Sequence, residues 1–204
     1  MTAPHSSLEI ERKYDADADT PLPDWSALPG VASVGEVEVR ELDARYLDTE
    51  DAALARAGVA LRRRTGGPDA GWHVKITVPE GKQELHWPLG DLPADEVPAP
   101  VVAAVERWAR PPFAPIARIR NQRHAYALTD ADGRLVAEFV DDRVEAEAAH
   151  SGRVTAWREW ELELGPAAPA DEIAEYFAAA DALVFAAGGR IAASGSKLAR
   201  ALTS

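Results

Sequence analysis

The stretch LEIERKY, residues 8–14, decides how the rest of the sequence is interpreted. Glu9, Glu11 and Lys13 stand two residues apart, and residues with this spacing share one face of a β-strand. If Ile10 marks the packed face of such a strand, the three charges simply face solvent. That interpretation is sufficient for one strand, so the question is whether the arrangement recurs.

Charged side chains stand two residues apart in several later strand-like segments. These segments are ALRRRT with Arg62 and Arg64, WHVKIT with His73 and Lys75, KQELHW with Lys82, Glu84 and His86, RIRNQR with Arg118, Arg120 and Arg123, and WREWELEL with Glu159, Glu161 and Glu163. In the last segment the alternate positions hold Trp160, Leu162 and Leu164, which must be buried. The glutamates of that strand are therefore expected on the other face.

Some arginines do not follow this alternation. Arg63 is out of phase with its neighbours and is expected on the outer surface. Arg123 shares a face with Arg118 and Arg120 only if a β-bulge intervenes, so the direction of those two stays open.

The bulk composition limits the classes of function. The 204 residues include 22 basic and 34 acidic ones, giving a net charge of −12, which disfavours nucleic acid as the main partner. The absence of cysteine excludes disulfides and thiolate metal sites. No apolar run is long enough for a membrane span, and MTAPHSS lacks the regions of a signal peptide. We expect one cytoplasmic domain over residues 1–204, without a membrane partner.

Turn-rich segments separate about eight predicted strands. The short turns favour antiparallel pairing, and a closed barrel is one way to protect the edges of such a sheet. Helices are expected over residues 49–58, 101–109 and 171–187, with Thr49 as a possible N-cap. Tyr46 and Asp48 are expected to support the strand and cap the first of these helices.

A sheet with its charged faces turned inward would gather acids and bases in one interior. Such an interior is costly unless the charges pair with one another or bind ions and ligands. Carboxylates suit Mg²⁺ or Mn²⁺, and arginine and lysine suit phosphate oxygens. This combination indicates a site for a highly anionic phosphate chain.

The sequence resembles the CYTH domain family, also called the triphosphate tunnel metalloenzymes. The matching segments follow the order of the family from about residue 8 to residue 202: EIERKY in the ExExK form, YLDT, ALRRR, VKIT, KQEL, NQR, EFVDD, ELEL and SGSKLA. Each segment is weak by itself, whereas the ordered set is strong. The resemblance implies an α+β fold, mainly antiparallel β, with an eight-stranded closed β-barrel tunnel and helices packed outside.

The resemblance also implies a set of site residues. The metal candidates are Glu9, Glu11, Glu84, Glu138, Asp142, Glu161 and Glu163. The phosphate candidates are Lys13, Arg62, Arg64, Lys75, Arg123 and Lys197, and the catalytic candidates are Glu161, Glu163 and Lys75. Alternation in the EFVDD strand favours Glu138 and Asp142 and turns Asp141 away. Many family members carry a second acid where this sequence has His86.

The activity implied by the resemblance is hydrolysis of a triphosphate that depends on Mg²⁺ or Mn²⁺. The expected partner is a small-molecule triphosphate or a short polyphosphate. The alternatives are a class IV adenylyl cyclase and a non-catalytic polyphosphate-binding module.

Two further features of the sequence are set aside. The ASGSKLA segment lacks the strand and spacing of a P-loop. The histidines show no metal-ligand spacing and are expected to be surface or strand residues: His5, His73, His124 and His150.

Overall fold

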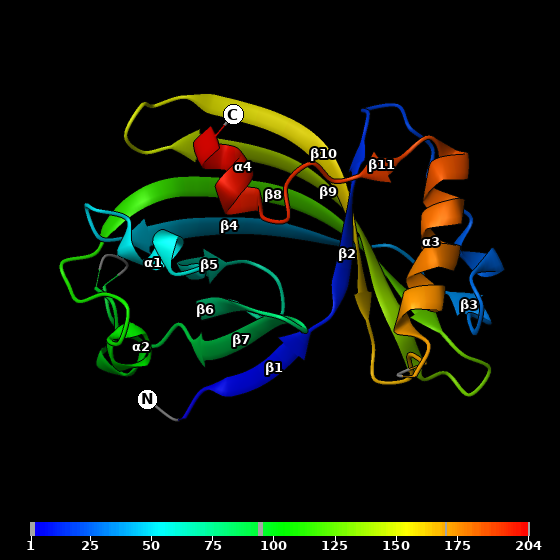
Figure 1. Cartoon of the computed structure of the whole chain (residues 1–204), viewed down its shortest axis with the longest axis horizontal. Coiled ribbons are helices and arrows are strands. Elements are labelled where there is room, and N and C mark those ends of the chain that lie inside the picture. The colour runs from blue at the N-terminus through cyan, green and yellow to red at the C-terminus, as the bar shows by residue number, and fades with distance from the viewer. Residues whose placement is uncertain (1–2, 94–95, 170, 204) are drawn as a thin grey trace.

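A single antiparallel sheet organises the chain, as the computed structural model shows for residues 3–93, 96–169 and 171–203 (Figure 1). Its strands are β1 (His5–Glu9), β2 (Glu11–Ala16), β3 (Ser33–Val34), β4 (Glu38–Asp48), β5 (Val59–Thr65), β6 (Gly71–Val78), β7 (Gly81–Pro88), β8 (Ala114–Thr129), β9 (Leu135–Ala148), β10 (Val154–Leu164) and β11 (Arg190–Ile191). The helices are α1 (Ala53–Arg56), α2 (Ala99–Val105), α3 (Ile173–Ala187) and α4 (Lys197–Thr203), with a 3₁₀ turn η1 at Trp25–Ala27. Mainly antiparallel β with helices was predicted correctly. The ends of the predicted domain, residues 1–2 and 204, lie outside the described residues.

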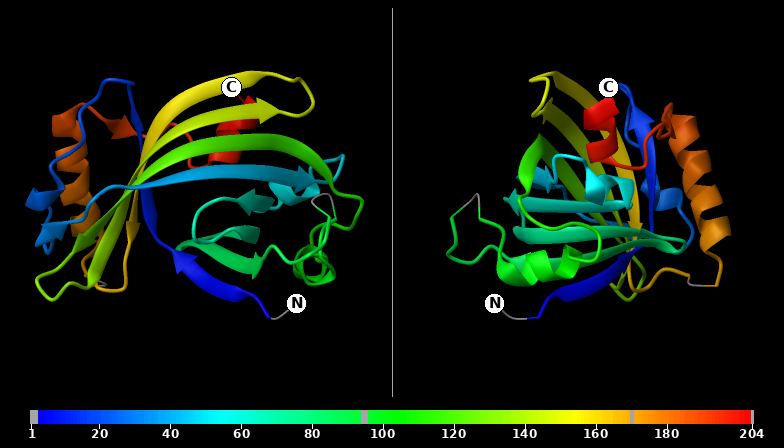
Figure 2. Two further views of the ribbon diagram at one scale, coloured as in Figure 1. Left: turned by 180° about the vertical axis from the view of Figure 1, so that it is seen from behind. Right: turned by 60° about the vertical axis from the view of Figure 1, so that its left-hand side comes forward.

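The strands follow one another in the order β1-β7-β6-β5-β4-β8-β9-β10-β2-β11, with β3 paired to β8. The sheet is strongly bent, so that β4, β8, β9 and β10 arch over β5, β6 and β7 (Figures 1 and 2). The segments VGEVEVREL, residues 34–42, and ARYLDT, residues 44–49, were each expected as strand material, and the single strand β4 spans most of both. No helix in the described ranges is long and apolar enough to cross a membrane.

The predicted eight-stranded closed barrel is wrong, because no ladder of hydrogen bonds joins the two ends of this eleven-stranded sheet. The two ends of the sheet are β1 and the two-residue strand β11, which pairs with β2. β1 pairs with β7, whereas β2 pairs with β10, and Ile10 lies between β1 and β2. The segment therefore divides at Ile10 between two ladders, and among the described residues neither β1 nor β11 has a second partner that would close the sheet. The alternation in residues 8–14 cannot reveal this change of partner.

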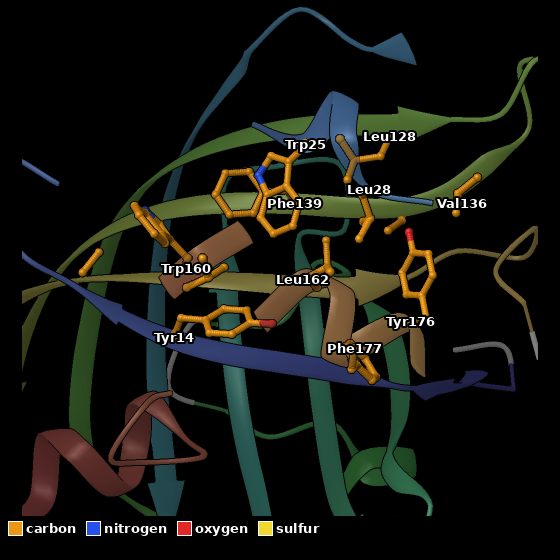
Figure 3. Close-up of a cluster of buried hydrophobic side chains, with 14 residues drawn as sticks. Tyr14, Trp25, Leu28, Leu128, Val136, Phe139, Trp160, Leu162, Tyr176 and Phe177 are labelled. Carbon is orange, nitrogen blue, oxygen red and sulfur yellow. The ribbon is translucent and has the colours of Figure 1, made fainter. Parts of the chain in front are cut away.

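The convex face of the sheet carries apolar packing on both of its halves. Against β2, β9 and β10, helix α3 buries Tyr176, Phe177, Ala180 and Val184 over Trp160 and its neighbours (Figure 3). Against β5, β6 and β7, helix α2 contributes Val101 and Val105 to a second cluster. These side chains occupy the alternate strand positions, and so the charged positions are left on the concave face.

Helix α4 packs on the concave face, where its Leu198 and Ala201 contact apolar residues of β4, β8 and β9. This seven-residue helix was not predicted from the sequence, since GGRIAASGSKLARAL shows little helical periodicity. Its position matters for the site because it begins at Lys197.

Asp48 holds the start of α1. Its buried carboxylate accepts the backbone N–H groups of Thr49, Leu54 and Ala55 at 2.7–2.9 Å. The Thr49 hydroxyl accepts a further N–H from Ala53 at 3.0 Å. Asp48 therefore caps the helix, as predicted from the sequence, and Thr49 assists it.

We expect Asp48→Ala to lower the free energy of unfolding by about 2–4 kcal/mol, because several N–H groups would lose their acceptor. Urea denaturation followed by circular dichroism measures this change. Asp51→Ala is the control, since the Asp51 side chain is 67% exposed and should cost about 0.5 kcal/mol or less. Equal losses in the two variants would contradict the capping role.

Candidate functional site

The concave face of the sheet encloses a charged cavity of about 130 Å³. Ten of the predicted residues line it: Glu9, Glu11, Lys13, Arg62, Arg64, Lys75, Arg123, Glu161, Glu163 and Lys197. Glu84 and Glu138 line an adjoining hollow, and Asp142 lies fully buried against Arg123 and Lys197. Strand alternation brings all of these residues together except Lys197, which is the first residue of helix α4.

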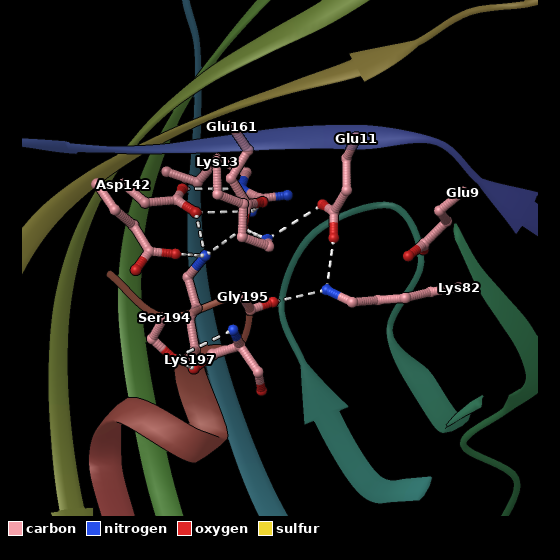
Figure 4. Close-up of polar contacts among 12 residues, drawn as sticks. Glu9, Glu11, Lys13, Lys82, Asp142, Glu161, Ser194, Gly195 and Lys197 are labelled. Carbon is pink, nitrogen blue, oxygen red and sulfur yellow. Dashed lines mark hydrogen bonds and ion pairs between the residues drawn. The ribbon is translucent and has the colours of Figure 1, made fainter. Parts of the chain in front are cut away.

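Three carboxylates converge on the ammonium group of Lys197 (Figure 4). The Lys197 Nζ atom lies 2.8 Å from Asp142 Oδ2, 2.5 Å from Glu159 Oε1 and 2.8 Å from Glu161 Oε1. Burial alone would lower the pKa of Lys197, but the three carboxylates outweigh it and raise the pKa well above its usual value. The lysine is thus a fixed positive charge.

Arg123 and Lys13 complete this cluster. Arg123 forms a bidentate pair with Asp142 at 2.7 and 2.8 Å, and its Nη2 also donates to Glu161 at 2.8 Å. Lys13 donates to Glu161 from the neighbouring strand β2. Burial opposes ionisation, but these cations hold the pKa of Asp142 at about 2 and that of Glu161 well below its usual value. Both acids are therefore ionised at neutral pH.

A second cluster surrounds Glu84 on β7. His73 Nδ1 lies 2.8 Å from Glu84 Oε1, and Lys75 Nζ lies 3.0 Å from Oε2. Burial lowers the pKa of His73 to about 3, so its ring is neutral and donates one hydrogen bond to the carboxylate. Burial would raise the pKa of Glu84, but His73, Lys75 and Arg62 together lower it far below its usual value.

The ExE glutamates of the first segment connect the two clusters. Glu9 accepts two hydrogen bonds from Lys75, at 2.6 and 2.8 Å. Glu11 pairs with Lys82 at 2.7 Å and with Lys13 at 3.0 Å. Figure 4 shows Glu9, Glu11, Lys13 and Lys82 facing the same space.

Glu163 differs from the other predicted acids, since no hydrogen bond or ion pair holds its carboxylate among the described residues. Glu163 is exposed to solvent by its accessible surface, yet partial desolvation of its carboxyl group by the surrounding protein raises its pKa to about 7. Desolvation is the largest cause of this rise. The nearby charges of Glu9, Glu11 and Glu161 raise the pKa further, whereas the charge of Lys75 lowers it. This carboxyl group is therefore far more easily protonated than Glu161.

Other predicted positions lie where the alternation indicated. Asp141 points to the convex face, where it accepts from Arg158 and from Trp160 Nε1. Strand β8 pairs without a bulge through its arginines, so Arg118 and Arg120 lie opposite to Arg123 and pair with acids outside the cavity. Arg63 does not line the cavity.

Sequence reasoning missed several members of the site. Glu159 was placed on the correct face but was not selected, although it contacts Lys197. His73 was set aside as an ordinary strand residue, yet it is fully buried against Glu84. The other polar cavity residues that were not selected are Tyr46, Asp69, Lys82, Asn121 and Ser196. Alternation would have selected Glu159 and Lys82, whereas Asp69 lies in a turn and gave no signal.

Two groups of side chains have ligand atoms close enough to hold one metal ion. Asp142, Glu159 and Glu161 each offer a carboxylate oxygen within 4.8 Å of the others, and all three are buried. The second group consists of Asp69, His73 and Glu84. The first group has only oxygen donors, which Mg²⁺ and Mn²⁺ prefer.

The chain belongs to the CYTH domain family, whose model matches residues 7–193. Two curated proteins of Mycobacterium tuberculosis, the uncharacterized proteins Rv2226 and MT2285, are each 39% identical to it over 173 residues. These matches cover 79% of this chain but 34% of the relatives, so the chain spans about a third of their length.

Solved structures share the fold at low sequence identity. A candidate adenylate cyclase from Bacillus halodurans has a TM-score of 0.63 at 17% identity, covering 96% of this chain and 97% of its own. The candidate adenylyl cyclase HpAC1 from Hippeastrum, reported to reveal a dominant triphosphatase activity, has a TM-score of 0.53 at 17% identity. That match covers 94% of both chains.

We expect Lys197→Met to lower the free energy of unfolding at pH 7 by about 3–5 kcal/mol in metal-free buffer, because three buried carboxylates would lose their shared cation. Millimolar Mn²⁺ should restore part of this loss by replacing the lost charge. Thermal unfolding with EDTA and with Mn²⁺ measures both effects.

Lys82→Met is the matched control, since Lys82 is 25% exposed and pairs with only one carboxylate, that of Glu11. Lys82→Met should lower the free energy of unfolding by less than Lys197→Met does, and Mn²⁺ should restore less of that loss. Equal losses of unfolding free energy and equal recovery with Mn²⁺ in the two variants would contradict the stabilising role of the Lys197 cluster.

Proposed function

We propose that this protein hydrolyses a phosphoanhydride bond of a triphosphate with the help of Mg²⁺ or Mn²⁺. The proposal rests on one observation: acidic and basic side chains from both ends of the chain line the same cavity. Seven basic and five acidic side chains line the charged cavity. Such a site fits a polyanion accompanied by a cation better than either one alone.

The metal would be held by carboxylates of the late strands, Asp142, Glu159 and Glu161, in place of the Lys197 ammonium that lies between them. Glu9 and Glu11 line the cavity beside this group. When bound, Mg²⁺ or Mn²⁺ supplies charge neutralisation at phosphate oxygens. The choice of all-oxygen donors supports these two ions over Zn²⁺.

The basic residues bind and orient the phosphates. Arg62, Arg64 and Lys75 come from adjacent strands β5 and β6, and Lys13 and Arg123 face them. Burial, with the like charges of Arg62 and Arg123 beside it, lowers the pKa of Arg64. A bound anion would relieve this crowding of positive charge, which supports a phosphate as the ligand.

A carboxylate must accept the proton of the attacking water. Glu161 is held by Lys13, Lys197 and Arg123, whereas no partner holds Glu163 within the described part of the chain. Glu163 is therefore the better placed of the two catalytic candidates, and Lys75 stabilises charge that develops on the phosphate.

Adenylyl cyclase chemistry would use the same charges with a ribose hydroxyl as the attacking group. The two solved relatives are described as candidate cyclases, and the Hippeastrum protein is described as having a dominant triphosphatase activity. We favour hydrolysis because it needs no adenine-reading pocket. The cytoplasmic location expected from the sequence stays a prediction.

Glu11→Ala and Glu161→Ala should each reduce the rate of metal-dependent triphosphate hydrolysis by roughly 10²–10³-fold, since each removes an acid that faces the phosphate and metal site. Phosphate release from tripolyphosphate, ATP and thiamine triphosphate, each with Mg²⁺ and with Mn²⁺, measures the effect. Cyclic AMP is assayed in the ATP reactions.

Glu145→Ala is the control, because Glu145 is exposed and pairs with Arg120 outside the cavity. It should keep the wild-type rate. Wild-type turnover in either cavity variant refutes the assignment, and production of cyclic AMP in place of phosphate would favour the cyclase.

A further inference from the structure

Three histidines lie in one row across the adjacent strands β1, β7 and β6 (Figure 1). His5 is the direct partner of His86 in one ladder, and His86 is the direct partner of His73 in the next. Residues that lie directly opposite each other in a ladder share one face of the sheet. Here that face is the concave one, since His5 and His86 line the hollow of about 340 Å³ that adjoins the charged cavity.

The ring of His73 has surroundings typical of a histidine that binds a metal ion. Its Nδ1 atom lies 2.8 Å from Glu84 Oε1, and its Nε2 atom lies 3.0 Å from the backbone carbonyl oxygen of Asp69. Both oxygens are acceptors, whereas a neutral imidazole has only one N–H group. Because Nδ1 donates to the carboxylate, the lone pair of Nε2 faces an oxygen and lacks a partner. A metal-binding histidine commonly donates its other ring N–H to a carboxylate in this way.

His86 brings a second imidazole to the same place. Its ring centroid lies 4.7 Å from that of His73. Its Nε2 atom is buried, and neither ring nitrogen has a hydrogen bond to any residue that the structure describes. A Cβ atom at Gly71 would lie 2.3 Å from this Nε2, so the ring occupies the space beside Gly71. The Nε2 atoms of both rings therefore face the segment of residues 69–71.

Asp69 adds a carboxylate to the two imidazoles. Ligand atoms of Asp69, His73 and Glu84 lie within 4.8 Å of one another. The Asp69 side chain is 52% exposed and forms an ion pair with Arg64, which also lines the hollow. This carboxylate is thus already directed toward a positive charge on the concave face.

The donor atoms of this group favour a different ion from that of the all-oxygen group. Asp142, Glu159 and Glu161 offer carboxylate oxygens alone, which suit Mg²⁺ and Mn²⁺. Two imidazoles and one carboxylate suit Zn²⁺, Co²⁺ or Ni²⁺. Burial lowers the pKa of His73 to about 3, so at neutral pH its ring is in the unprotonated form that binds metals.

We propose that His73, His86 and Asp69 form a site for a transition-metal ion such as Zn²⁺, with Glu84 orienting the ring of His73. Three protein ligands leave one position of a tetrahedral ion for water. The site is separate from the all-oxygen group and does not depend on the proposed hydrolysis. Sequence spacing could not show it, because the two histidines are brought together by strand register.

The test is a titration of the full, untagged chain with Co²⁺ in excess Mg²⁺, which occupies the all-oxygen group. Tetrahedral Co²⁺ with nitrogen ligands absorbs visible light strongly, whereas octahedral Co²⁺ with oxygen ligands absorbs weakly. The wild-type chain should develop this strong absorption at one equivalent of Co²⁺, and Zn²⁺ should remove it. His86→Gln and Asp69→Ala should each weaken Co²⁺ binding by roughly 100-fold, and Glu84→Gln by roughly tenfold.

His150→Gln is the matched control, since His150 is an exposed turn residue outside the hollow. It should leave the absorption and the Co²⁺ affinity unchanged. Circular dichroism checks the fold of each variant, and Asp69→Ala decides if His86→Gln misfolds, because Asp69 is an exposed turn residue. Absence of the strong absorption in the wild-type chain, or unchanged Co²⁺ affinity in the folded variants of His86 and Asp69, overturns the proposal.

Discussion

The structure depends on mutual neutralisation of buried charges across the concave face of the sheet. Asp142 is fully buried and Glu161 nearly so, and each would oppose folding if it stood alone. Arg123 and Lys197 contact both acids, and Lys13 adds a third cation at Glu161. Because each ion has several partners, the cluster behaves as one unit, and a phosphate or a metal can replace some of those partners.

Strand register explains why the site needs this balance. Lys13 lies directly opposite Glu161 on the paired strands β2 and β10, which is favourable. The next inward pair is Glu11 opposite Glu163, two like charges that disfavour the pairing. Lys82 and Lys13 offset Glu11, while Glu163 has only a raised pKa to reduce the repulsion. The pairing of Glu11 with Glu163 is thus unfavourable for stability, and it occurs at the candidate site.

Alternation in the sequence was sufficient to predict which residues share the concave face, because a period of two follows directly from strand geometry. It separated Asp142 from Asp141 and left Glu161 facing inward. It could not predict how the sheet ends, since the change of partner at Ile10 depends on contacts with strands that are distant in the sequence. His73 was missed for a related reason, because its importance lies in a cross-strand contact with Glu84.

The division of the first segment between two distant ladders has a consequence for synthesis on the ribosome. β2 leaves the ribosome well before its partner β10, which spans residues 154–164. β2 therefore stays without this partner while the strands between the two are synthesised. Contacts this remote slow folding and leave strand edges exposed meanwhile. The charges along this strand disfavour aggregation during that wait, so residues of the candidate site also protect the growing polypeptide.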